Sequence, residues 1–112
     1  MQQALDAIRE LQDLRGILPE YELASRARAI FEREGMKRID LGDFLNQKGY
    51  TGYRLAQAVG TFGKAVKSAY VEEHGVPPIK AHILVNGDVR PVAWYLEMDR
   101  NLIETVFATW SA

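Results

Sequence analysis

Lysine and arginine side chains in the middle of the chain are the residues best suited to chemistry. Residues 44–71 contain no aspartate or glutamate, although the chain has 15 acidic residues. The same stretch contains four basic residues, which are Lys48, Arg54, Lys64 and Lys67. Basic side chains near a polyanion displace its counterions, and this displacement supplies much of the affinity for nucleic acid. The stretch therefore predicts a surface that contacts phosphates.

Two further basic residues, Lys80 and Arg90, extend this segment toward the C-terminus. Residues 48–91 carry six basic and three acidic side chains, whereas the whole chain has a formal net charge of -1. The positive charge is therefore local, and the molecule as a whole is no polycation. A plain solvated surface would have the same composition, and that alternative stays open at this point.

The spacing around Thr51 is typical of a helix-turn-helix. A short helix is expected over residues 41–47 with Asp40 as its cap, followed by a tight turn and a second helix that Thr51 caps. The second helix of this motif enters the major groove of DNA by its N-terminal end. Arginine pairs with guanine and glutamine with adenine on the base edges. The side chains expected to approach the bases are Thr51, Tyr53, Arg54 and Gln57.

The next elements complete a winged-helix pattern. Gly60 and Gly63 predict a break in the helix, with a separate helix from Phe62 to about His74. Asn86-Gly87 between two β-prone runs is a strong signal for a β-hairpin, which would form the wing. Pro91 indicates that the second strand lies at a sheet edge or is bulged there.

Apolar spacing predicts helices at both ends of the chain. Residues 2–15 have a helical stripe of Leu5, Ile8, Leu11 and Leu14, and a second helix runs from about Pro19 to Glu34. The arginines of that second helix are expected on a solvated face; they are Arg26, Arg28 and Arg33. A final helix is expected after Asp99, which can cap it.

The expected fold class is mainly α with one β-hairpin, a winged helix-turn-helix-like single domain. The length of 112 residues suits one domain. Within it, residues 1–35 are expected to form a helical hairpin. Residues 40–110 are expected to form the helix-turn-helix, the hairpin wing and the C-terminal helix.

Several functional classes find no support in the residues. The chain has no cysteine, and its two histidines, His74 and His82, have no metal-spaced cluster around them. We therefore expect no catalytic residues, no metal, no cofactor and no enzyme activity. No apolar run approaches the roughly 20 residues of a membrane-spanning helix. The first residues are amphipathic and charged, unlike a signal peptide, so a cytoplasmic location is expected.

The C-terminal part of the chain resembles a known group of proteins. The segments that carry the resemblance are residues 62–70, 74–78, 85–92, Tyr95 and 99–106, which read FGKAVKSAY, HGVPP, VNGDVRPV, Y and DRNLIETV. This pattern is similar to the C-terminal regions of phage and prophage regulatory proteins of the antirepressor or KilA-like kind. The resemblance implies a helix, a hairpin and a closing helix, together with a phage origin and a role in transcription regulation through DNA binding or repressor antagonism.

Two functions are predicted from these patterns. The first is a phage-type DNA-binding regulator that holds duplex DNA through the helix-turn-helix and the wing. The alternative is a protein-interaction or oligomerisation module, such as a phage protein that antagonises a repressor or a host protein. Its support is the apolar stripe near the N-terminus, which would form a homodimer unless it packs on the chain's own core.

Overall fold

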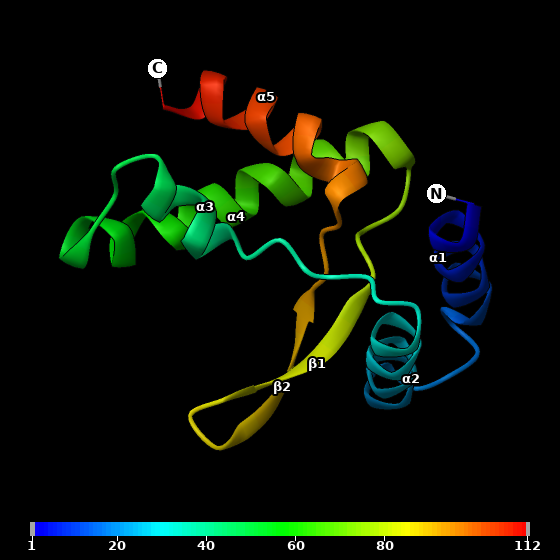
Figure 1. Ribbon diagram of the computed structural model, residues 1–112. Coiled ribbons are helices and arrows are strands. Elements are labelled where there is room, and N and C mark those ends of the chain that lie inside the picture. The colour runs from blue at the N-terminus through cyan, green and yellow to red at the C-terminus, as the bar shows by residue number, and fades with distance from the viewer. Residues whose placement is uncertain (1, 112) are drawn as a thin grey trace. The chain divides into compact units, whose positions relative to one another are not determined.

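The structure, a computed structural model, describes residues 2–111 and is mainly helical, with one two-stranded antiparallel hairpin (Figure 1). This confirms the expected fold class at the level of helices plus a hairpin. The helices are α1 (Gln2–Leu14), α2 (Glu20–Arg33), α3 (Leu41–Gln47), α4 (Gly52–His74), the short 3-10 helix η1 (Glu97–Asp99) and α5 (Arg100–Trp110). The strands are β1 (Lys80–Val85) and β2 (Asp88–Ala93).

The chain divides into two compact units. Unit 1 comprises Met1–Lys37 and Ile79–Trp94, and unit 2 comprises Arg38–Pro78 and Tyr95–Ala112. The division expected from the sequence grouped the hairpin with the helix-turn-helix. In the structure the hairpin belongs with α1 and α2, because β1 packs against α2.

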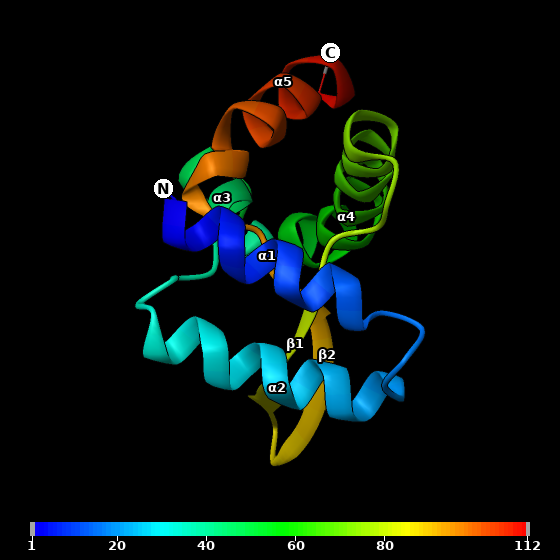
Figure 2. The same cartoon turned by 90° about the vertical axis from the view of Figure 1, so that its right-hand side faces the viewer.

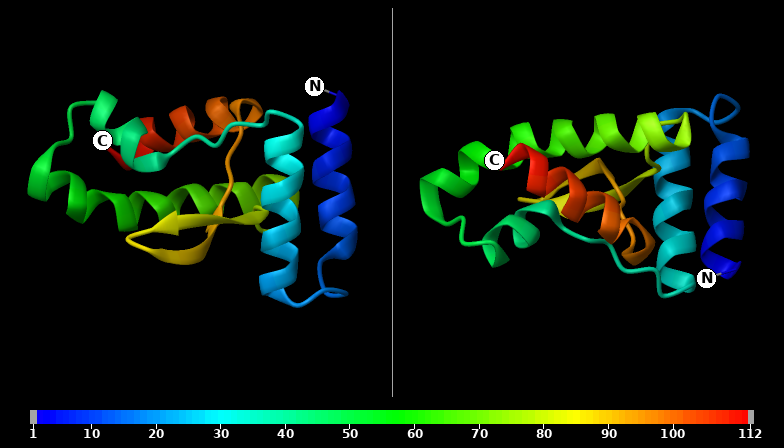
Figure 3. Two further views of the ribbon diagram at one scale, coloured as in Figure 1. Left: turned by 60° about the horizontal axis from the view of Figure 1, so that its bottom comes forward. Right: turned by 90° about the horizontal axis from the view of Figure 1, so that it is seen from above.

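In unit 1, α1 and α2 lie side by side (Figures 2 and 3). Leu11 and Ala7 of α1 are buried in this contact region, while Leu5 is exposed. The buried stripe of α2 includes Ala27, Ile30 and Phe31. The apolar stripe of the first helix is therefore largely used inside the chain.

The hairpin forms at the predicted turn. Asn86 and Gly87 have φ values of 51° and 83°, which are the left-handed values that a type I′ hairpin turn requires. Val85 pairs with Asp88 on either side of this two-residue loop. Pro91 is exposed on β2, an edge strand of the two-stranded sheet, as its missing N–H predicted.

In unit 2, α3 begins where expected and α4 differs from the expectation. The Asp40 side chain accepts a hydrogen bond from the Asp43 N–H at 3.0 Å and so caps α3. The predicted break at Gly60 and Gly63 is wrong, because α4 continues without interruption to His74. The cost of two helical glycines is outweighed by the burial of Phe62, Val66 and Tyr70 of the same helix.

Aromatic side chains form the core of unit 2. Phe62 of α4 stacks on Phe44 of α3, with ring centroids 5.7 Å apart, and is fully buried. From α5, Phe107 meets the Phe62 ring edge-on and Trp110 packs against it at 5.0 Å. These contacts hold α3, α4 and α5 together, and they position the outer face of α4.

Two predicted helix caps are not formed. Thr51 occupies the N-cap position of α4, but its side chain makes no capping hydrogen bond. Asp99 does not cap α5; its Oδ2 atom instead accepts a hydrogen bond from the Leu96 N–H at 2.9 Å. The chain forms the turn of η1 before α5, and this turn directs the Asp99 carboxylate back toward Leu96.

Candidate nucleic-acid interface

The connection between α3 and α4 is short and held by hydrogen bonds. Residues 48–51 join the two helices, and the Tyr50 N–H donates to the Leu45 carbonyl at 3.0 Å. The Asn46 side-chain amide donates to the Tyr50 carbonyl at 3.1 Å. These bonds tie the turn back to α3, so the start of α4 has a defined position within unit 2.

One face of α4 is polar, exposed and free of carboxylates. Tyr53, Gln57, Lys64 and Lys67 are spaced i, i+4, i+11 and i+14, which places them on the same side of a helix with 3.6 residues per turn. All four are exposed, and Tyr53 has 78% of its surface accessible. Within residues 2–111, neither lysine has an ion-pair partner. This set of four residues is called the α4 face below.

Two of the α4-face residues contact each other. The Gln57 side-chain Nε2 donates a hydrogen bond to the Tyr53 hydroxyl at 3.0 Å. The bond joins consecutive turns near the N-terminal end of α4, the end that enters the groove in a helix-turn-helix. The Thr51 hydroxyl lies at the same end and is exposed.

Arg54 lies beside the α4 face rather than on it. Its guanidinium lies over the Tyr50 ring, 4.1 Å from the centroid, and makes no ion pair with any residue that the structure describes. A cation over an aromatic ring keeps its charge, since the ring supplies only a quadrupole. Arg54 therefore keeps a full positive charge next to the first turn of α4, which contains no acidic residue.

Lys48 differs from Arg54, Lys64 and Lys67 because a carboxylate compensates its charge. Its ammonium is 2.8 Å from the Glu104 carboxylate of α5 and also lies over the rings of Phe44 and Phe107. The sequence offered no sign of this pairing, because Glu104 is far away along the chain. Lys48 has a role in joining α3 to α5 within unit 2.

Lys80 and Arg90 belong to unit 1 and are paired with carboxylates. The Lys80 ammonium is 3.4 Å from Glu20 of α2, and the Arg90 guanidinium is 3.9 Å from Asp88, two residues earlier on β2. Both pairs are exposed, where ion pairs are weak and screened by salt. Nine residues were predicted to contact DNA. Among them, the basic side chains without a carboxylate partner in the described residues are Arg54, Lys64 and Lys67.

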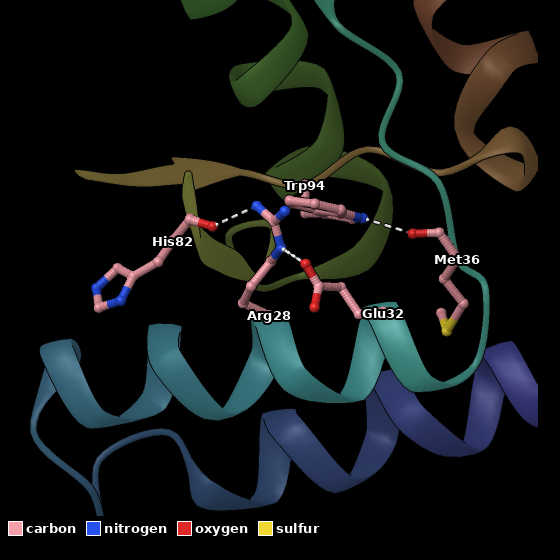
Figure 4. Close-up of polar contacts among 5 residues, drawn as sticks. All are labelled: Arg28, Glu32, Met36, His82 and Trp94. Carbon is pink, nitrogen blue, oxygen red and sulfur yellow. Dashed lines mark hydrogen bonds and ion pairs between the residues drawn. The ribbon is translucent and has the colours of Figure 1, made fainter. Parts of the chain in front are cut away.

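Unit 1 contains a polar cluster that the sequence analysis missed (Figure 4). Arg28, expected on a solvated face, donates from its Nη1 atom to the His82 carbonyl at 2.8 Å and pairs with Glu32 at 2.7 Å. The same guanidinium lies over the Trp94 ring, and the Trp94 indole N–H donates to the Met36 carbonyl at 3.0 Å. The cluster joins α2 to the hairpin, and nothing local in the sequence distinguishes Arg28 from its neighbours.

The two histidines have different surroundings. His82 is buried against Tyr21, with ring centroids 4.4 Å apart, and its Nε2 atom has no hydrogen-bond partner among the described residues. His74 is exposed at the end of α4 beside Tyr70. In the described part of the chain, no group of three potential ligands could hold a metal ion.

Two ionisable groups of unit 2 are shifted by burial. Burial and the nearby Asp99 carboxylate raise the pKa of Tyr95 to about 12. Burial also raises the pKa of Asp99, although the Leu96 N–H that bonds to it acts in the opposite direction. Both groups lie in unit 2, where Asp99 is the last residue of η1.

None of the helices formed by the described residues is long and apolar enough to cross a lipid bilayer. Comparisons of the chain with protein-family models, curated proteins and solved structures find no match. The similarity of residues 62–110 to phage regulators therefore stays a prediction that rests on the sequence pattern.

Proposed function

We propose that this protein is a phage-type regulator that binds duplex DNA, with α3, the turn and α4 acting as a helix-turn-helix. The observation that carries the proposal is the α4 face. It combines two lysines that have no carboxylate partner in the described part of the chain with polar side chains at the end of α4 that would enter the groove. We propose no catalytic role and no cofactor.

The spacing along α4 assigns different tasks to its two ends. Tyr53 and Gln57, with Thr51 and Arg54 beside them, lie within the first two turns and would approach base edges in the major groove. Lys64 and Lys67 lie about 16 and 21 Å farther along the axis than Tyr53, at 1.5 Å per residue. A major groove is about 12 Å wide, so these lysines would meet the phosphates at its border.

The electrostatic contribution can be estimated from the unpaired cations. Arg54, Lys64 and Lys67 would release about three counterions, which corresponds to a slope of log affinity against log salt of about -3. Lys48, Lys80 and Arg90 add less, because each would first have to leave its carboxylate.

The winged-helix architecture is also part of this proposal. The β1–β2 hairpin follows α4 in the sequence, as a wing would, but its basic residues are paired. We therefore assign the main DNA contact to α4. The regulatory role and the phage origin are supported by the sequence resemblance of residues 62–110.

The test is a titration of a fluorescent duplex with the full chain at several salt concentrations. K64Q/K67Q is expected to lose about two units of the salt slope, since each phosphate contact contributes about 0.9. The control R26Q/K37Q removes two exposed cations of unit 1 that also lack ion pairs, and it should keep the wild-type slope. Absence of binding at low salt, or equal slopes for K64Q/K67Q and wild type, would contradict the proposal.

A second candidate function, a protein-interaction or oligomerisation module, is favoured by exposed apolar side chains in unit 1. Leu84 and Val89 face each other across the hairpin and are 71% and 51% accessible. Ile17, between α1 and α2, is 73% accessible. Light scattering over a concentration series, with L84S/V89T for comparison, tests the homodimer version. A wild-type chain that is monomeric throughout would rule out that version.

A further inference from the structure

Tyr53 has a hydroxyl group whose only partner in residues 2–111 is the side chain of Gln57. The ring is exposed, so Tyr53 adds little to the core of unit 2. Its hydroxyl accepts the hydrogen bond from Gln57 Nε2 at 3.0 Å. This hydrogen bond holds the amide end of the Gln57 side chain, which would otherwise rotate freely in solvent.

The bond leaves the recognition atoms of Gln57 available. A glutamine amide has one acceptor oxygen and two N–H donors. One N–H is directed to Tyr53, and the other N–H and the carbonyl oxygen have no hydrogen-bond partner among residues 2–111. An adjacent donor and acceptor match the N7 acceptor and the N6 amino donor that adenine presents in the major groove.

From this geometry we infer that Tyr53 is a positioning residue that holds the Gln57 amide for an adenine in the major groove. The inference rests on the proposed DNA binding and adds the base pair that is read. Arg54 does not compete for the amide, since its guanidinium lies over Tyr50.

The experiment starts with selection from randomised duplexes of about 20 base pairs, which cover about two turns of B-DNA. The wild-type chain should select an A·T pair at one position, with an affinity about 5- to 150-fold above a duplex with G·C there. Q57A should lose this preference. Y53F should weaken this preference about fivefold, the value of one neutral hydrogen bond.

Y21F is the matched control, because Tyr21 is another exposed tyrosine whose hydroxyl has no hydrogen-bond partner in the described chain. It should keep the wild-type preference. The inference is overturned if Y53F discriminates as well as wild type, if guanine is selected, or if the chain binds DNA without base preference. In these three cases the proposed DNA binding still stands. A chain that binds no duplex at low salt overturns both.

Discussion

Two glycines inside α4 permit a direct stability test of unit 2. Gly60 and Gly63 have helical backbone angles, and a Cβ atom added at either position would meet no atom within 4 Å. Alanine is favoured over glycine in a helix interior by about 1 kcal/mol. G60A and G63A should therefore each raise the free energy of unfolding by about 1 kcal/mol, and the double variant by about 2 kcal/mol.

The assay is urea and thermal unfolding followed by far-UV circular dichroism. For a chain of this size, 1 kcal/mol corresponds to roughly 4 °C in Tm, so the double variant should melt about 8 °C higher. G75A is the control, because Gly75 ends α4 in the left-handed region at φ 76°. A side chain there is strained, and G75A should lower the stability by about 1 kcal/mol.

The result that refutes the reasoning is a loss of stability in G60A or G63A. Such a loss would mean that the backbone at these glycines is not helical and that α4 is broken there. A gain in both variants together with a loss in G75A would support the continuous helix.

Three further predictions concern buried polar groups. Tyr95, whose pKa is raised from 10.0 to about 12, contributes stability below pH 10 that is lost as the pH rises toward 12. The free energies of unfolding of wild type and Y95F, measured in urea, should diverge by up to about 3 kcal/mol across that range. Parallel pH profiles of the two would contradict this. Burial raises the pKa of Asp99, so its neutral form is favoured and stability falls as the pH rises above 3.8. Asn can still accept the hydrogen bond from Leu96, so D99N should be more stable than wild type at neutral pH, and this advantage should vanish near pH 3. H82F removes the buried Nε2 atom, which has no hydrogen-bond partner among the described residues. The free energy of unfolding in the same assay should stay unchanged or rise by about 1 kcal/mol. A clear loss of stability would show that the imidazole nitrogen is needed.

Local signals in the sequence were sufficient for much of the fold. The hairpin was predictable from Asn86-Gly87, since a two-residue turn needs positive φ at both positions. Asp40 marked the start of α3, and the helix end expected at about His74 is the end of α4. Each of these features depends on the conformation of a few adjacent residues.

The candidate site was only partly predictable. The absence of carboxylates in residues 44–71 is visible in the sequence, and it identified Lys64 and Lys67. The compensation of Lys48 by Glu104, and of Lys80 by Glu20, was not visible. Ion pairs between residues far apart in the chain depend on which helices pack together.

The amino-acid sequence by itself determined where turns and helix ends occur, and where positive charge is concentrated, because these properties belong to single residues and their neighbours. Tertiary structure decided that α4 continues through Gly60 and Gly63, since burial of Phe62 and Val66 of the same helix outweighs the cost of the glycines. It also decided that Arg28 joins α2 to the hairpin. These outcomes depend on contacts between distant segments, and the energy of such contacts exists only once the chain has folded.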